Sequence, residues 1–395
     1  CFSFWKAPPD DLLSYLKEVS VKKPQLPKKK WKIKKIPSQC FAHCTGLETM
    51  LLAQCNNIGP SAFQDSGVTT MDLTHVTCVQ KDAFKNCIGL HTVQFGSNPV
   101  KLLDGAFCNT GIVHLKLPNV SVDKAAYVFA RCLKLVSVCY EPTTTTDKIW
   151  IGPYMFAMCD KLTSCKFAEN TVGIKSHAFE MCIALLSIRL PAGLTTIETA
   201  AFMTCVKLRS VQYDTRKLIS APDVEEPYTF GRMAFGRCVH LRHLQLERHN
   251  IQLGESCFED CARLQSARFR GNGTLEIANY AFNKCVRLKA VYFGDAELQL
   301  GTYVFARNRK LRVVRFPPIV HSIGEGSFTD CSGLPGITLP TNKTFTKLET
   351  SLFQGCTALR FMHVPGNIHT IKALALCEVQ HVILDCYEYN KYIVL

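Results

Sequence analysis

Apolar residues recur along this chain with a period of about 23 residues. The phrase Ala-Phe-x-x-Cys-x-x-Leu stands at 178–185, 201–208, 234–241 and 281–288. The anchor of each repeat is its Phe: Phe41, Phe63, Phe84, Phe107, Phe129, Phe156, Phe179, Phe202, Phe235, Phe258, Phe282, Phe305, Phe328 and Phe353, with Leu374 as the stand-in of a degenerate last repeat. Such a period predicts coils that stack and bury their apolar residues on one another.

The pattern inside one repeat predicts its elements. After the Cys comes Leu-x-x-Ile-x-Leu, as at 185–190, whose final alternation indicates a strand with one buried face. Five residues before the anchor an apolar residue recurs, interrupted only by Lys124 and His369, which predicts a second extended segment. The spacing of three between Phe, Cys and Leu suits a short helical turn.

These repeats resemble the BspA-like class of leucine-rich repeats, and the resemblance covers 36–395. It implies a mainly β fold: a parallel-sheet leucine-rich-repeat solenoid of about fifteen 23-residue coils with short helical turns. It also implies a binding scaffold, because the family shares no catalytic site. Three repeats lack the Cys. In two of them, 66–68 and 110–112, a shorter segment replaces the Cys and its neighbours, and in a third Asn308 stands at the Cys position.

Twelve of the 21 cysteines occupy the repeat position. They are Cys44, Cys87, Cys132, Cys159, Cys182, Cys205, Cys238, Cys261, Cys285, Cys331, Cys356 and Cys377. A buried free Cys behaves as a small apolar residue, and a column pointing one way has poor geometry for disulfides. We therefore expect buried, reduced thiols and an intracellular, reducing compartment. Zinc is a weaker alternative, since Cys40/Cys44 and Cys257/Cys261 have no matched second pair.

The sequence contains no motif of a known catalytic or nucleotide-binding site. A nucleophile elbow, a P-loop, a dinucleotide fingerprint and a paired-histidine metal motif are all missing from it. We expect a protein that is not an enzyme, with no cofactor and no small-molecule substrate. No run of eighteen apolar residues exists, so we expect no membrane span.

The charge is the most informative functional signal. The net charge is +14, and residues 1–35 contribute +7 from ten Lys and three acidic residues. Residues 10–19 have apolar positions at helical spacing after two acids, which predicts a short helix that caps the first coil. Residues 22–35 hold eight Lys and no acid, which indicates a basic arm or a solvated linker. The domains are thus 1–35, a capping helix and basic arm, and 36–395, the solenoid.

The strand face of the solenoid, formed by the outward residues of the Leu-x-x-Ile-x-Leu strands, is also basic. Four outward positions per repeat include sixteen basic residues and three acidic ones. Like charges on neighbouring rungs repel, so an anionic partner explains this bias better than solubility does. The residues predicted to contact the partner are Lys28, Lys29, Lys30 and Lys32 in the arm and Lys116, Lys166, Arg189, Arg209, Arg242, Arg268, Lys289, Arg312, Arg315 and Arg360 on the strand face.

Three functions remain open at this point. The first is a non-catalytic protein-binding scaffold, a structural subunit of a larger intracellular assembly. The alternative is an RNA-contacting component of a ribonucleoprotein such as an organellar ribosome. A cell-surface adhesin or receptor comes third. The chain begins at Cys1 and not at Met, so we expect an upstream segment, and an organelle address stays open. Insertions at 141–148 and 213–228 and tyrosines at 387–392 are further candidate contact regions.

Overall fold

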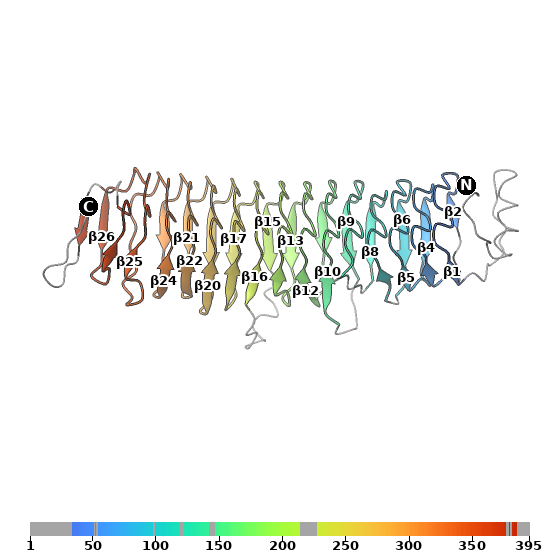
Figure 1. Ribbon diagram of the computed structural model, residues 1–395, viewed down its shortest axis with the longest axis horizontal. Helices are drawn as coiled ribbons and strands as arrows, with labels where there is room; N and C mark the ends of the chain where they lie inside the picture. The colour runs from blue at the N-terminus through green and yellow to red at the C-terminus, as the bar shows by residue number, and fades with distance from the viewer. Residues whose placement is uncertain are drawn as a thin grey trace, which may run out of the picture.

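The computed structural model shows an elongated stack of parallel coils (Figure 1). It describes residues 34–384 except 51, 53, 98, 119, 121, 123, 142–146, 214–226, 377–378 and 380. We number each coil by its anchor, from coil 1 at Phe41 to coil 14 at Phe353. The predicted capping helix, the basic arm except for Lys34 and Lys35, and the C-terminal tyrosines lie outside the described residues, as does most of both insertions.

The Leu-x-x-Ile-x-Leu segments form the first ladder, in which each strand pairs in parallel with the strand of a neighbouring coil. Its strands are β2 (Thr49–Met50), β4 (Thr70–Leu73), β6 (Thr92–Phe95), β8 (His114–Leu117), β9 (Ser137–Tyr140), β11 (Ser164–Lys166), β13 (Ser187–Leu190), β15 (Ser210–Tyr213), β17 (His243–Leu246), β19 (Ser266–Phe269), β21 (Ala290–Tyr292), β23 (Val313–Arg315), β26 (Phe361–Val364) and β28 (His381–Leu384). The predicted alternation is confirmed, since β13 has its Ile188 and Leu190 buried and its Ser187 and Arg189 exposed.

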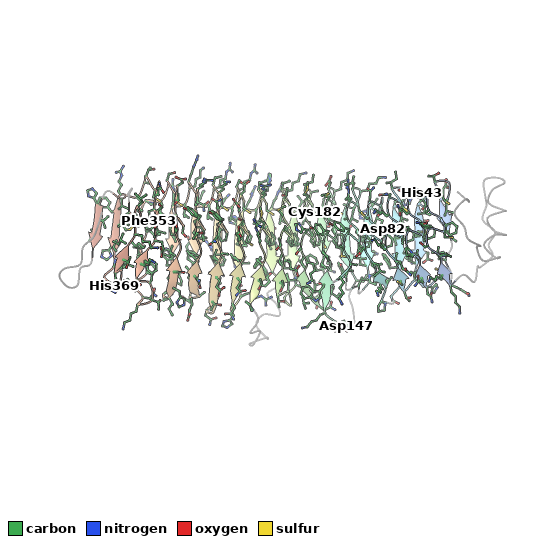
Figure 2. The ribbon with its side chains drawn as sticks, in the orientation of Figure 1. His43, Asp82, Asp147, Cys182, Phe353 and His369 are labelled. Carbon is green, nitrogen blue, oxygen red and sulfur yellow. The ribbon has the colours of Figure 1, made fainter. Side chains whose placement is uncertain are left out.

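The extended segment before each anchor forms a second parallel ladder. Its strands are β1 (Lys35–Ile36), β3 (Asn57–Ile58), β5 (Cys78–Val79), β7 (Lys101–Leu102), β10 (Ile149–Ile151), β12 (Thr171–Ile174), β14 (Thr196–Ile197), β16 (Tyr228–Phe230), β18 (Ile251–Leu253), β20 (Thr274–Ile277), β22 (Glu297–Leu300), β24 (Val320–Ile323), β25 (Lys347–Leu348) and β27 (Thr370–Ile371). Asp147 and His369, just before β10 and β27, mark the lower edge of Figure 2.

The turn side, which carries the anchors, contains no helix among the described residues, so the predicted helical turns are not observed. Around Phe179, alternate N–H groups donate to the next coil, as His177 does to Thr199 and Met181 to Met203. Both flanking residues have left-handed backbones, with φ of 60° and 58°. The spacing of three therefore comes from successive i→i−3 turns, because every second N–H leaves the coil instead of continuing a helix.

The core is a column of rings between the ladders and the turn side. Successive anchors from Phe41 to Phe353 stack with centroids 5.0 to 5.8 Å apart. The Cys column lies beside the rings, and ten of its thiols donate to the backbone oxygen of an anchor Phe at 2.9 to 3.3 Å. Cys182 and Phe353, which are labelled in Figure 2, are both fully buried inside the stack.

The last coil is displaced by two residues from the sequence assignment. Ile371 pairs with Leu348, so Ile371 and not His369 continues the apolar column of the second ladder. Leu376, five residues after Ile371, is buried in the anchor position, whereas Leu374 is 56% exposed. Leu374 instead has the positive φ of the residue two before an anchor. The assignment of Leu374 is wrong because a spacing count cannot distinguish two nearby leucines.

Among the described residues two coils lack one strand, so each ladder has fourteen described strands and the solenoid about fourteen complete turns. Coil 5, where Lys124 interrupts the apolar column, has no strand of the second ladder among its described residues. Coil 13 contributes only the Thr338–His363 bridge to the first ladder. Its Pro335 has no N–H to donate and Gly336 brings no side chain, and both residue types weaken a strand.

Candidate binding surface

The outward side chains of the first ladder form three columns on the strand face. In each coil they are the first and second residues after the Leu, and the residue that precedes the final apolar position. The register places equivalent residues above one another, so Gln245, Arg268, Tyr292 and Arg315 follow in order along the third column. Neighbours in a column are about 4.8 Å apart along the backbone.

All ten predicted partner-binding residues of the solenoid project into solvent. The exposed set is Lys116, Lys166, Arg189, Arg209, Arg242, Arg268, Lys289, Arg312, Arg315 and Arg360. Lys28, Lys29, Lys30 and Lys32 lie outside the described residues. The exposure follows from the strand alternation, which turns the residues next to each buried position outward.

The structure gathers seven of these ten residues on coils 8 to 14. We call this set the basic cluster: Arg209, Arg242, Lys289, Arg312 and Arg360 in the first column, and Arg268 and Arg315 in the third. Backbone hydrogen bonds join Arg242 to Arg209 and Arg312 to Lys289 across neighbouring coils. Lys116, Lys166 and Arg189 stand apart on coils 4, 6 and 7.

The basic cluster is not neutralised by acidic side chains. None of its seven residues takes part in an ion pair among the described parts of the chain. Nearby acids pair with other bases, as Glu247 does with Arg270 at 3.2 Å. Lysines away from the strand face have partners, such as Lys175 with Glu198 at 2.8 Å. The cluster is thus an uncompensated positive field on one side of the molecule.

Tyr292 organises two of the arginines and was missed in the sequence. The guanidinium of Arg268 lies 5.1 Å from the ring centroid of Tyr292, and that of Arg315 lies 5.6 Å from it. The ring is therefore held between cations from the preceding and following rungs, which attracts both guanidiniums to its π-system. The sequence signal for this contact is a Tyr that lies 24 residues after one Arg and 23 residues before another, at the spacing of the repeat.

The middle column changes its chemistry along the strand face, which sequence reasoning also missed. Over coils 1 to 10 it carries only hydroxyl residues and histidines: Thr49, Thr70, Thr92, His114, Ser137, Ser164, Ser187, Ser210, His243 and Ser266. Hydrogen bonds link neighbours there, as between His243 Nδ1 and Ser266 Oγ at 3.0 Å. From coil 11 the column continues with Ala290, Val313, Gly336 and Phe361.

The half-buried Arg248 forms a cluster with Tyr228 and Tyr213, whose hydroxyl oxygens are buried. Arg248 donates to the backbone oxygens of Ala192 and Leu194 and lies over the ring of Tyr228. Burial lowers the pKa of Arg248 and raises the pKa of the Tyr213 and Tyr228 hydroxyls. Tyr213 and Tyr228 flank 214–226, which lies outside the described residues.

The described residues offer no assembled site for a metal ion. They contain no group of three or more His, Cys, Asp or Glu side chains that could hold one. Within those residues neither Cys40/Cys44 nor Cys257/Cys261 has further metal ligands, and no disulfide joins two of the eighteen described cysteines. No helix within the described ranges has the length and apolar character required to cross a membrane.

Comparisons with known proteins agree with the repeat pattern. The sequence profile of the family described as BspA type Leucine rich repeat region (6 copies) matches residues 14–136, 126–221, 149–272, 222–334 and 275–386. A leucine-rich repeat protein from Bacteroides ovatus is 19% identical over 89% of this chain and 76% of its own, with a TM-score of 0.54. A leucine rich cell surface protein from Faecalibacterium prausnitzii is 18% identical over 90% and 89%, with a TM-score of 0.40. No curated protein sequence matches significantly.

The comparisons correct the expected localisation. The chain matches the BspA type family and the structure of a bacterial leucine-rich repeat protein from Bacteroides ovatus, and these matches overturn the expectation of an intracellular, reducing compartment. The physical basis of that expectation also fails. Ten of the column thiols are buried and donate to backbone oxygens, and buried structural thiols are inert in any compartment, so the cysteine pattern does not indicate a reducing one.

Proposed function

Because the chain belongs to the family of BspA type leucine-rich repeat proteins, we propose that it is a non-catalytic scaffold that binds an acidic protein partner on coils 8 to 14. The observation that carries the proposal is the basic cluster, seven exposed cations without acidic partners among the described residues. Stacked like charges cost folding free energy, and an anionic partner offsets that cost.

A protein partner is favoured over the RNA-contacting alternative by the aromatic residues of the strand face. Proteins that bind single-stranded nucleic acids offer open aromatic rings on which bases stack. Both faces of Tyr292 are covered by Arg268 and Arg315. His381 stacks on one face of Phe361 at 4.8 Å. The face thus offers charges and apolar edges, a combination typical of protein interfaces.

Site-specific photocrosslinking tests the proposal. A crosslinking residue is placed at Gln265, which lies between Arg242 and Lys289 in the first column, and in a second variant at Gln354, which is exposed on the turn side. The protein is produced in its native source, irradiated, treated with nuclease, and its adducts are identified by mass spectrometry. We expect an acidic protein bound to the Gln265 variant and none bound to the Gln354 variant. Adducts confined to Gln354, or nucleic acid adducts at Gln265, would contradict the proposal.

A further inference from the structure

Coil 13 leaves a position of the strand face empty. The Thr338–His363 bridge aligns Gly336 with Phe361 of the next coil. A Cβ built on Gly336 meets no heavy atom within 4 Å, and the residue does not have a positive φ. Neither packing nor backbone conformation requires glycine here. The middle column therefore has open space above Gly336.

Apolar side chains border this space along the column. Val313 on coil 12 is 36% exposed, and Phe361 on coil 14 is 60% exposed. They stand two rungs apart, about 10 Å along the solenoid axis, which leaves room for one side chain between them. Large exposed apolar side chains that flank an empty position are typical of a site where a partner residue is buried.

Members of the basic cluster surround the same space. Arg312 and Arg360 occupy the first column on coils 12 and 14, and Arg315 occupies the third column on coil 12. Arg315 is also held against Tyr292, so less side-chain entropy is lost when it binds an anion. An apolar centre with an arginine rim is complementary to an apolar side chain flanked by carboxylates.

We infer that coils 12 to 14 receive a bulky apolar side chain of the partner, inserted above Gly336 between Val313 and Phe361, while acidic residues on either side of it bind the arginine rim. This inference rests on the proposed function and specifies the chemistry of the partner segment. The recognised feature is an extended acidic stretch interrupted by one aromatic or large aliphatic residue.

Two labelled synthetic peptides provide the probes. One is a run of Glu with a single Phe in its centre, and the other has Ser in place of that Phe, so the two have equal length and charge. Binding of each to the full chain is measured by fluorescence anisotropy at physiological salt. We expect the Phe peptide to bind about tenfold tighter, because its ring leaves water between Val313 and Phe361.

Two variants, each with a matched control, test whether the preference for the Phe peptide arises at Gly336 and Phe361. G336L fills the empty position, and G46L adds the same side chain on coil 1, where a Cβ also meets nothing within 4 Å. F361S removes the border of the space, and I88S removes an apolar side chain of similar exposure, 67%, on coil 3. We expect G336L and F361S to abolish the preference for the Phe peptide while affinity for the Ser peptide stays the same. The two controls keep the wild-type preference, and thermal melts establish that all four variants are folded.

Each outcome separates this inference from the proposed function. Equal binding of the two peptides to wild type, or a preference that survives G336L, overturns the inference and leaves an acidic partner in place. Failure of wild type to bind either peptide overturns both. An RNA oligonucleotide that binds wild type but not G336L, with neither peptide bound, assigns the site to the other class of partner and also overturns both.

Discussion

The thiol of Cys182 donates a hydrogen bond to the backbone oxygen of Phe156 in the preceding coil across 3.1 Å. Burial raises the pKa of Cys182 to about 12, so the sulfur keeps its proton and remains a donor. The same contact joins Cys205 to Phe179 at 3.2 Å. The repeat therefore selects cysteine for two properties at once, a small volume and a buried donor that reaches the preceding coil.

Asn308 tests this role, because it stands at the Cys position of coil 12. Its Nδ2 donates to the oxygen of Phe282 at 3.0 Å, but its Oδ1 is buried without a partner. We expect N308C to raise the free energy of unfolding by about 1 kcal/mol, since it keeps a donor and removes an unsatisfied acceptor. N308A should lower it, because the donor is lost and a cavity remains. Denaturant unfolding compares the three proteins, and a less stable N308C would contradict the assigned role.

The raised thiol pKa values predict a loss of stability in alkaline solution. The ordinary thiol pKa is 9.0, whereas burial raises that of Cys182 and Cys238 to about 12 in the fold. Above pH 9 the unfolded chain releases thiol protons that the folded chain retains, so the free energy of unfolding falls as pH rises from 9 to 12. Melting temperatures measured with reductant at pH 8 and pH 10 should therefore differ sharply. Equal values would show that the thiols ionise in the fold.

The fold was predictable from the sequence because one coil repeats. The anchors and the alternation of the first ladder recur often enough that each copy supports the others, and Phe202 or Ile188 lies where the period places it. The turn side was predicted incorrectly, since apolar spacing of three fits both a helix and successive turns. The exposed basic residues followed from alternation, but Tyr292 and Gly336 did not. Their importance depends on the side chains of adjacent coils, and counting charged residues along the sequence does not reveal those neighbours.

Two substitutions in the last coil test its corrected register. L376A removes a side chain buried in the anchor position and should cost about 2 kcal/mol, at the lower end for a core leucine because only one neighbouring coil is among the described residues. L374A removes a mostly exposed side chain and should change stability by less than about 0.5 kcal/mol. Hydrogen exchange of the β28 amides is the readout, since a solenoid can lose its end locally. Equal effects of both changes would contradict the register.

The basic cluster makes a prediction about salt. Changing Arg268, Lys289, Arg312 and Arg315 together to Gln removes four exposed cations that have no ion pair among the described residues, so the fold should persist. Binding of the Ser-containing Glu peptide should weaken strongly, because fewer charges face the anion and surface attraction falls with them. The affinity of this variant for the peptide should depend less steeply on ionic strength, because salt screens fewer charge–charge contacts.

The matched control removes four cations from the turn side instead: Arg131, Arg237, Lys284 and Arg307, all exposed. Both quadruple variants have the same net charge, so a general electrostatic effect would weaken binding equally in the two. Docking on the strand face predicts that only the first variant loses affinity and salt dependence. Affinity is measured at two salt concentrations for wild type and both variants. If peptide binding weakens equally in both variants, the net charge of the chain attracts the anion and the strand face does not. The partner must then dock elsewhere.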